Sequence, residues 1–224
     1  MSVSLQSAAA RFRGSGVSAM AARRIGFAAV GLLLAQLIFG TAQPAWADDA
    51  VDRLSIPGPI SFNAVSYRLS WSSHPSPNYY KQEYLPPGQT SEHFERMLLV
   101  EAIAQGANVD AVVSALVDQL HRRKSTDPIV NFATFKSPTS GEVILDFVLS
   151  DYNYNRAGSM VEWNAYRYAA LKDPGGHSGV LLFGLSRRAY GDDATEFLRQ
   201  LKTVRRAETD ALAKYPLPVV RVNE

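Results

Sequence analysis

Two stretches with helical spacing of apolar residues frame a run of short, strand-like segments in the second half of the chain. In the stretch 108–124 the apolar residues recur every three or four positions, at Val109, Val112, Val113, Leu116, Val117 and Leu120. The stretch 192–214 has the same spacing, at Ala194, Phe197, Leu198, Leu201, Val204, Ala211 and Leu212. Four segments between these helices are bounded by turn sequences, and we expect strands at 129–135, 142–150, 160–170 and 179–188.

Further strands are predicted before the first helix. Residues 64–71 and 79–85 are separated by a proline-containing turn, so we expect them to pair as a hairpin. Residues 92–103 fit either a short helix leading into a strand or one longer strand. Short connections favour antiparallel neighbours. The predicted fold class is therefore α+β, an antiparallel β-sheet covered by two main helices in a sandwich.

The first 47 residues are typical of an export signal. Arg23 and Arg24 precede a 16-residue apolar run that ends at Gly40, and a small-residue cleavage site follows at 45–47. A bilayer span needs about 20 apolar residues, so a cleaved signal is favoured over a permanent membrane anchor. The ordinary secretory route is favoured over the twin-arginine route, and translation starts at Met1 or at Met20.

Cleavage after residue 47 leaves 177 residues in a periplasmic or secreted protein. We expect an extended arm at 48–60, which contains two prolines, and a single α+β domain at 61–224. The chain has no cysteine, so neither a disulfide nor a lipid-modified cysteine can form.

The charge of the mature chain argues against nucleic-acid binding. Four of the 23 basic residues lie in the leader, which leaves 19 against 21 acidic residues and no excess of positive charge. The remaining basic clusters, at 122–124, 187–188 and 205–206, are short, and we expect them to be solvated.

Residues that could support catalysis are scattered. The four histidines lack the spacing of a helical zinc pair, so no metal site is predicted. His177 and Ser178 are the best nucleophile-and-base candidate, but adjacent loop residues seldom face each other. Carboxylates at Asp146, Asp151 and Glu162 are expected to face solvent. We therefore predict a protein without catalytic residues and without a cofactor.

Aromatic residues indicate a binding surface instead. Tyr152, Tyr154 and Arg156 form a loop after a predicted strand, and Tyr166 and Tyr168 share one side of the next strand. Tyrosine and arginine are enriched at protein interfaces, so these five residues are the predicted partner-binding site. The alternative is that the tyrosines pack on the sheet with wetted hydroxyl groups.

The segment 80–90, followed by Phe94 and Met97, together with the order of strands and helices, resembles the PsbP/Mog1-like family of small α+β proteins. The resemblance covers roughly residues 60–215 and implies an accessory, partner-binding role. The chain departs from the family by its proline-containing arm and by His93-Phe94, where a tryptophan is expected.

Two functions follow as hypotheses. The first is an exported accessory protein that binds another protein of the envelope. The second is a small-ligand carrier or a hydrolase with a pocket between a helix and the sheet.

Overall fold

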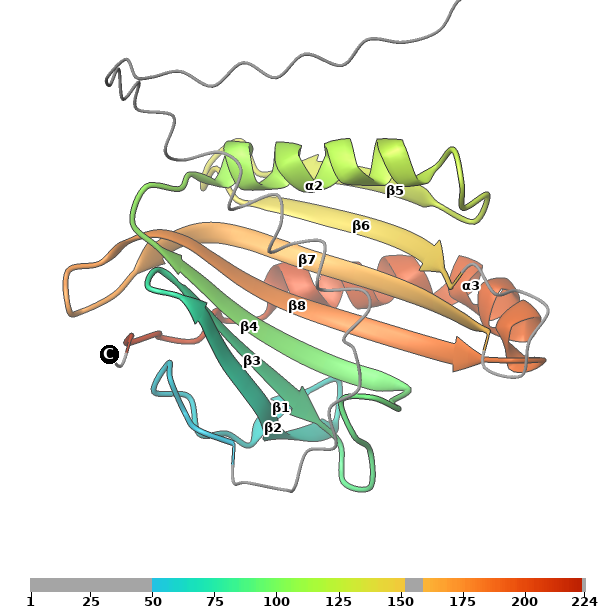
Figure 1. Cartoon of the computed structure of the whole chain (residues 1–224), viewed down its shortest axis with the longest axis horizontal. Helices are drawn as coiled ribbons and strands as arrows, with labels where there is room; N and C mark the ends of the chain where they lie inside the picture. The colour runs from blue at the N-terminus through green and yellow to red at the C-terminus, as the bar shows by residue number, and fades with distance from the viewer. Residues whose placement is uncertain (1–49, 152–158, 223–224) are drawn as a thin grey trace, which may run out of the picture.

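The computed structural model of the chain describes residues 50–151 and 159–222 (Figure 1). Eight strands are present in these ranges: β1 (Ile60–Phe62), β2 (Val65–Ser76), β3 (Tyr79–Leu85), β4 (Arg96–Ala104), β5 (Asn131–Lys136), β6 (Val143–Ser150), β7 (Met160–Lys172) and β8 (Ser178–Tyr190). Two helices accompany them: α2 (Val109–Arg123) and α3 (Asp193–Lys214). The predicted hairpin, both helices and all four later strands are confirmed, whereas β1 was missed.

The strands form one antiparallel sheet in the order β1-β2-β3-β4-β8-β7-β6-β5. The sheet is curled into a half-barrel (Figure 1). After β4 the chain crosses through α2 to the far edge of the sheet, then returns strand by strand until β8 pairs with β4. Strands that are distant in sequence therefore meet at the centre of the sheet, along the β4–β8 pair.

The two helices cover opposite faces of the sheet. Successive residues of a strand point to opposite faces, and the central strands carry apolar residues on both, so each face has a surface against which a helix can pack. Phe197, Leu201 and Leu212 of α3 pack with Trp163 and Phe183 in one buried cluster. The stripe of α2 packs against β6, β7 and β8 in a second cluster on the other face. The class α+β is thus confirmed, with one helix on each face.

Side-chain caps stabilise one end of each helix, from a neighbouring residue in α2 and from a distant strand in α3. Asn108 caps α2, since its side-chain oxygen accepts a hydrogen bond from the backbone N–H of Ala111 at 2.9 Å. Arg167 of β7 caps the other helix: its Nη1 donates to the carbonyls of Leu212, at 3.1 Å, and Tyr215, at 2.6 Å. A cation at this position also stabilises the negative end of the helix dipole.

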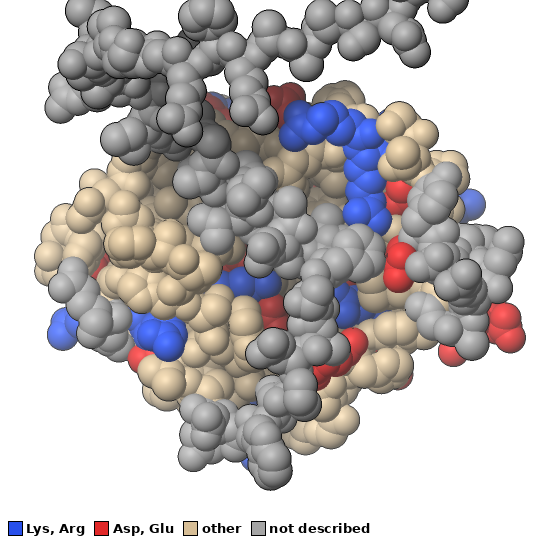
Figure 2. All heavy atoms as spheres, viewed as in Figure 1, with Lys and Arg blue, Asp and Glu red and all other residues tan. Residues whose placement is uncertain are grey.

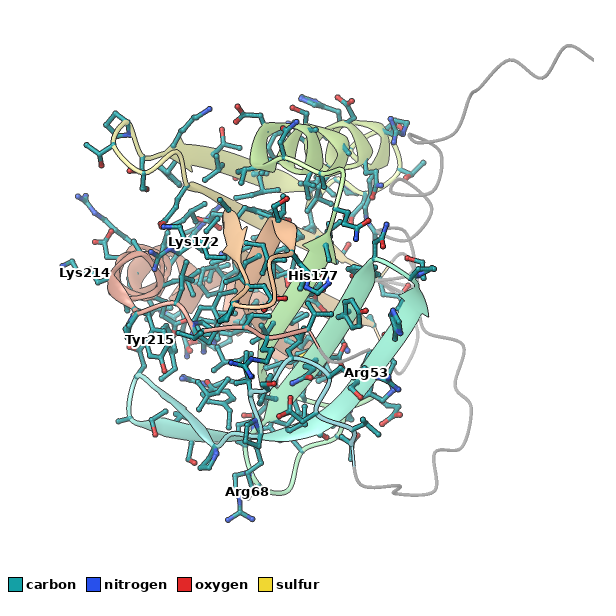
Figure 3. All side chains as sticks on the ribbon, turned by 90° about the vertical axis from the view of Figure 1, so that its left-hand side faces the viewer. Arg53, Arg68, Lys172, His177, Lys214 and Tyr215 are labelled. Carbon is teal, nitrogen blue, oxygen red and sulfur yellow. The ribbon has the colours of Figure 1, made fainter. Side chains whose placement is uncertain are left out.

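The described part of the N-terminal arm belongs to the core. Leu54 and Ile56 are buried in the cluster beneath α3. Gln82 of β3 fastens the arm, because its Oε1 accepts from the backbone N–H of Arg53 at 2.5 Å and of Leu54 at 2.9 Å. The C-terminal tail leaves α3 at Tyr215 and runs beneath the sheet toward the β7–β8 hairpin (Figure 3).

Several charged residues expected in solvent are buried, which corrects the sequence interpretation. Asp146 is 4% exposed, and it accepts from the indole Nε1 of Trp163 and from Arg205 Nε, both at 2.6 Å. Glu162 is 5% exposed and pairs with Arg188. The prediction of solvated basic residues is wrong at these arginines, because cross-strand and helix–sheet pairing supplies a carboxylate for each.

Candidate functional site

The α2 side of the sheet carries two groups of polar side chains, one on β3 and β4 and the other on β7 and β8. Strand alternation and register place them on one face, which we call the polar sheet face. Its members are Tyr79, Lys81, Glu83, Glu101, Glu162, Asn164, Tyr166, Tyr168, Ser186 and Arg188. Figure 2 looks onto this side of the molecule and shows basic and acidic side chains intermingled there. The main contacts of the described helices are with β6, β7 and β8.

Glu101 of β4 is the centre of the first group. It is 2% exposed, and its Oε2 accepts a hydrogen bond from the Tyr79 hydroxyl at 2.7 Å. Lys81 lies directly opposite Glu101 in the register and forms an ion pair with Glu83 at 2.8 Å. Burial raises the pKa of Glu101, and this outweighs the lowering by Lys81 and by the Tyr79 hydrogen bond. Burial would lower the pKa of Lys81, but Glu83 and Glu101 together raise it.

A chain of hydrogen bonds links the second group. Arg188 Nε donates to Glu162, and Asn164 Nδ2 donates to the other oxygen of that carboxylate at 2.8 Å. Ser186 Oγ donates to Asn164 Oδ1. The Arg188 guanidinium also lies 4.0 Å above the ring of Phe94. Each charge in this group is therefore oriented by at least one neighbour.

Tyr166 and Tyr168 join the polar groups to the α2 core. The Tyr166 ring packs across Gly184, where a Cβ atom would lie 2.8 Å from Tyr166 Cδ1. Burial, with Glu101 nearby, holds the pKa of both tyrosines well above the usual value, so both hydroxyls stay protonated. The Tyr168 hydroxyl and Glu101 Oε1 are buried without hydrogen-bond partners among the described residues. Such unpaired groups are uncommon in native proteins.

Trp71 of β2 extends this face toward the sheet edge. It pairs with Glu83 in the register, and the residue is 39% exposed. Lys81 Nζ lies 5.6 Å from the centre of the Trp71 ring, within the range of a cation–π interaction. A large aromatic side chain thus remains accessible next to buried charges.

The structure locates two of the five predicted partner-binding residues. Tyr166 and Tyr168 lie on the same face, as the strand alternation predicted, and they are 4% and 1% exposed. Tyr152, Tyr154 and Arg156 lie outside the described residues. Their role in partner binding stays a prediction.

Sequence reasoning missed Trp71, Lys81, Glu83 and Glu101. The alternation in 79–85 places Tyr79, Lys81 and Glu83 on one side of a strand, and this signal was available. The pairing of Lys81 with Glu101 was not available, because it depends on the β3–β4 register.

His177, the best candidate for a catalytic base, is held by a carboxylate. Its Nδ1 pairs with Asp173 across the β7–β8 hairpin, and Asp173 Oδ1 also accepts from the backbone N–H of Gly175 at 2.9 Å. The carboxylate thus fixes the imidazole within the hairpin turn.

Within residues 50–151 and 159–222, no group of three or more His, Cys, Asp or Glu side chains is placed to hold a metal ion. Neither described helix combines the length and apolar character needed to cross a bilayer.

A protein-family model matches residues 54–217. The chain belongs to that family. The match begins at Leu54, a buried residue of the arm, and ends just beyond α3, so it contains the whole sheet and both described helices. Comparison with curated proteins and with solved structures gave no match.

Replacing Glu101 by glutamine is expected to stabilise the protein most at neutral and higher pH. The pKa of the Glu101 carboxyl group is raised in the folded state, so as pH increases the carboxyl group ionises first in the unfolded chain. The free energy of unfolding therefore decreases with pH until the folded-state pKa is passed. Glutamine removes that loss and still accepts the Tyr79 hydrogen bond. The free energy of unfolding of both proteins is measured in urea at pH 8 and at pH 4.5, and the stabilisation by glutamine should be larger at pH 8. The exposed Glu95→Gln is the control, and an equal gain at both pH values would contradict the expectation.

Proposed function

We propose that the mature chain is an exported accessory protein that binds another protein of the cell envelope through the polar sheet face, without catalysis. The observation that carries this proposal is Trp71, an accessible tryptophan beside a preorganised row of charges and tyrosines. Tryptophan is enriched among residues that dominate binding energy, and buried, oriented polar groups next to it provide specificity.

The preorganisation of the polar sheet face also supports binding. Lys81, Glu83, Glu162 and Arg188 are largely buried and already held by ion pairs, so this face need not reorder when a partner binds Trp71.

We further propose that the curled sheet with its two helices is a PsbP/Mog1-like sandwich. Its support is the order of elements, with a strand hairpin, a crossover helix, returning strands and a terminal helix. A role in the periplasm or outside the cell rests on the leader-like sequence at 1–47.

Trp71→Ala is expected to weaken partner capture at least tenfold, about 1.4 kcal/mol in binding free energy. The test expresses the full-length chain with a C-terminal tag in its native host, cross-links intact cells and quantifies captured proteins by mass spectrometry. The same spectra identify the N-terminus of the mature chain, which we expect at Asp48.

Phe135→Ala is the matched control, because Phe135 is an exposed aromatic residue on β5 at the opposite edge of the sheet. Capture should survive this change. Tyr152→Ala combined with Tyr154→Ala tests the predicted loop separately. A partner set unaffected by Trp71→Ala, in a variant with an unchanged circular dichroism spectrum, would refute binding through this face.

A hollow of about 340 Å³ between α2 and β5 favours a second candidate function, that of a small-ligand carrier. Val113, Val117 and Phe132 line it, and the ion pair of Lys136 with Asp110 at 2.8 Å borders it. An apolar lining with a few polar groups is typical of ligand sites. A small molecule that co-purifies with the chain in native mass spectrometry would favour this alternative.

A further inference from the structure

Two arginines face each other on the α3 side of the sheet, opposite to the polar sheet face. Arg96 of β4 and Arg187 of β8 are direct cross-strand partners. Arg187 Nη1 donates to Glu208 of α3 at 3.0 Å, and the Tyr67 hydroxyl of β2 is within electrostatic reach of both arginines and of Glu208. We call these four residues the arginine cluster.

The arginine cluster carries an uncompensated positive charge. Like charges directly opposite each other on neighbouring strands are destabilising. Glu208 neutralises Arg187, but no carboxylate of the described residues forms an ion pair with Arg96. An anion between the two guanidinium groups would remove the repulsion.

Buried polar atoms in the arginine cluster also lack partners. Arg187 Nε and Glu208 Oε2 are buried and make no hydrogen bond within the described residues, and the Tyr67 hydroxyl, which lies beside Arg96, is buried there with no hydrogen bond of good geometry. Tyr67 is 0% exposed, and burial raises the pKa of its hydroxyl although Arg96 lowers it, so the group is a protonated donor. Leaving a buried polar group unpaired costs about 1–3 kcal/mol. Two donors and one acceptor therefore point to a missing ligand.

We propose that the arginine cluster binds a small oxyanion that also carries a hydroxyl or amino group. The planar guanidinium groups of Arg96 and Arg187 suit a carboxylate or phosphate oxygen pair. Tyr67 and Arg187 Nε donate to the same anion, and Glu208 Oε2 accepts from the hydroxyl or amino group. The side chains of Arg187 and Glu208 are 16% and 12% exposed, so the arginine cluster borders the surface while its three unpaired atoms lie beneath it.

The test is thermal unfolding and isothermal titration calorimetry of the full-length chain with inorganic phosphate, acetate, lactate and glycine, at constant ionic strength set by sodium chloride. We expect saturable binding and a raised Tm with at least one oxyanion, and tighter binding for lactate or glycine than for acetate. If phosphate binds but lactate and glycine bind no more tightly than acetate, the cluster is an inorganic anion site. That result would overturn the proposal that Glu208 accepts a hydrogen bond from the ligand's hydroxyl or amino group.

Three variants separate binding from folding. Arg96→Gln should weaken binding at least tenfold. Tyr67→Phe should also weaken it, while leaving the free protein as stable or more stable, because an unpaired hydroxyl is removed. Arg68→Gln is the control, since Arg68 lies on the neighbouring position of β2 and points away from the molecule (Figure 3). Absence of saturable binding by all four probes, or binding that survives Arg96→Gln and Tyr67→Phe, would overturn the proposal.

Discussion

Gly179→Ala is expected to destabilise the protein by about 4 kcal/mol or more, because the added methyl group has no space. A Cβ atom on Gly179 would overlap the Ile103 carbonyl oxygen and lie 3.2 Å from the Gln105 backbone nitrogen. Gln105 N–H donates to the Ser178 carbonyl at 2.7 Å, so the backbones of β4 and β8 are already in close contact here. The overlap is relieved only by separating β4 from β8 at this end of their pairing.

The measurement is the free energy of unfolding in urea, followed by circular dichroism. Gly141→Ala is the matched control: Gly141 has a positive φ of 72° but open space around its Cα. It should cost only about 1–2 kcal/mol, the strain of a left-handed residue. Equal losses in the two variants would contradict the expectation that overlap with β4 costs more than left-handed strain alone.

Local patterns were sufficient for the helices and most strands. Asn108 and the apolar stripe of α2 are neighbours in sequence, so cap and buried face could both be identified. The hairpin of β2 and β3 was equally local. The strand β1 was missed because it has three residues, too few for an alternating pattern to be recognised.

The position of β5 could not be predicted from the sequence. Crossing through α2 can bring the chain to several places in the sheet, and packing of that helix on β6, β7 and β8 selects the far edge. This choice makes β8 the neighbour of β4, and all of the cross-strand chemistry at the centre of the sheet depends on it.

The features of the candidate sites that lie within one strand could be predicted from the sequence, whereas those that join distant segments could not. The shared face of Tyr166 and Tyr168 follows from alternation along one strand. The pairing of Arg96 with Arg187 requires the β4–β8 register, which no local pattern contains. Burial of Asp146 likewise depends on α3 lying over the sheet, so a single carboxylate on a strand was misread as solvent-facing.

Arg205→Ala is expected to destabilise the protein by about 3 kcal/mol, because it leaves the Asp146 carboxylate buried without its countercharge. Arg205 Nε donates to Asp146 Oδ2 at 2.6 Å, and the Asp146 side chain is 6% exposed. The Trp163 indole still donates to the other oxygen, at 2.6 Å, but one neutral donor does not replace a guanidinium. The pair joins α3 to β6, so its loss should also loosen the helix from the sheet.

Arg206→Ala is the control for this prediction, since it removes the same residue type one position later in the same helix. Arg206 is 94% exposed and lies 3.9 Å from Asp210, so its loss should cost less than about 0.5 kcal/mol. Urea unfolding of both variants measures the difference, and hydrogen exchange of the α3 amides locates it. Indistinguishable stabilities would mean that Asp146 is satisfied without Arg205. A large difference with protection lost specifically in α3 would show that this buried pair holds the helix on the sheet.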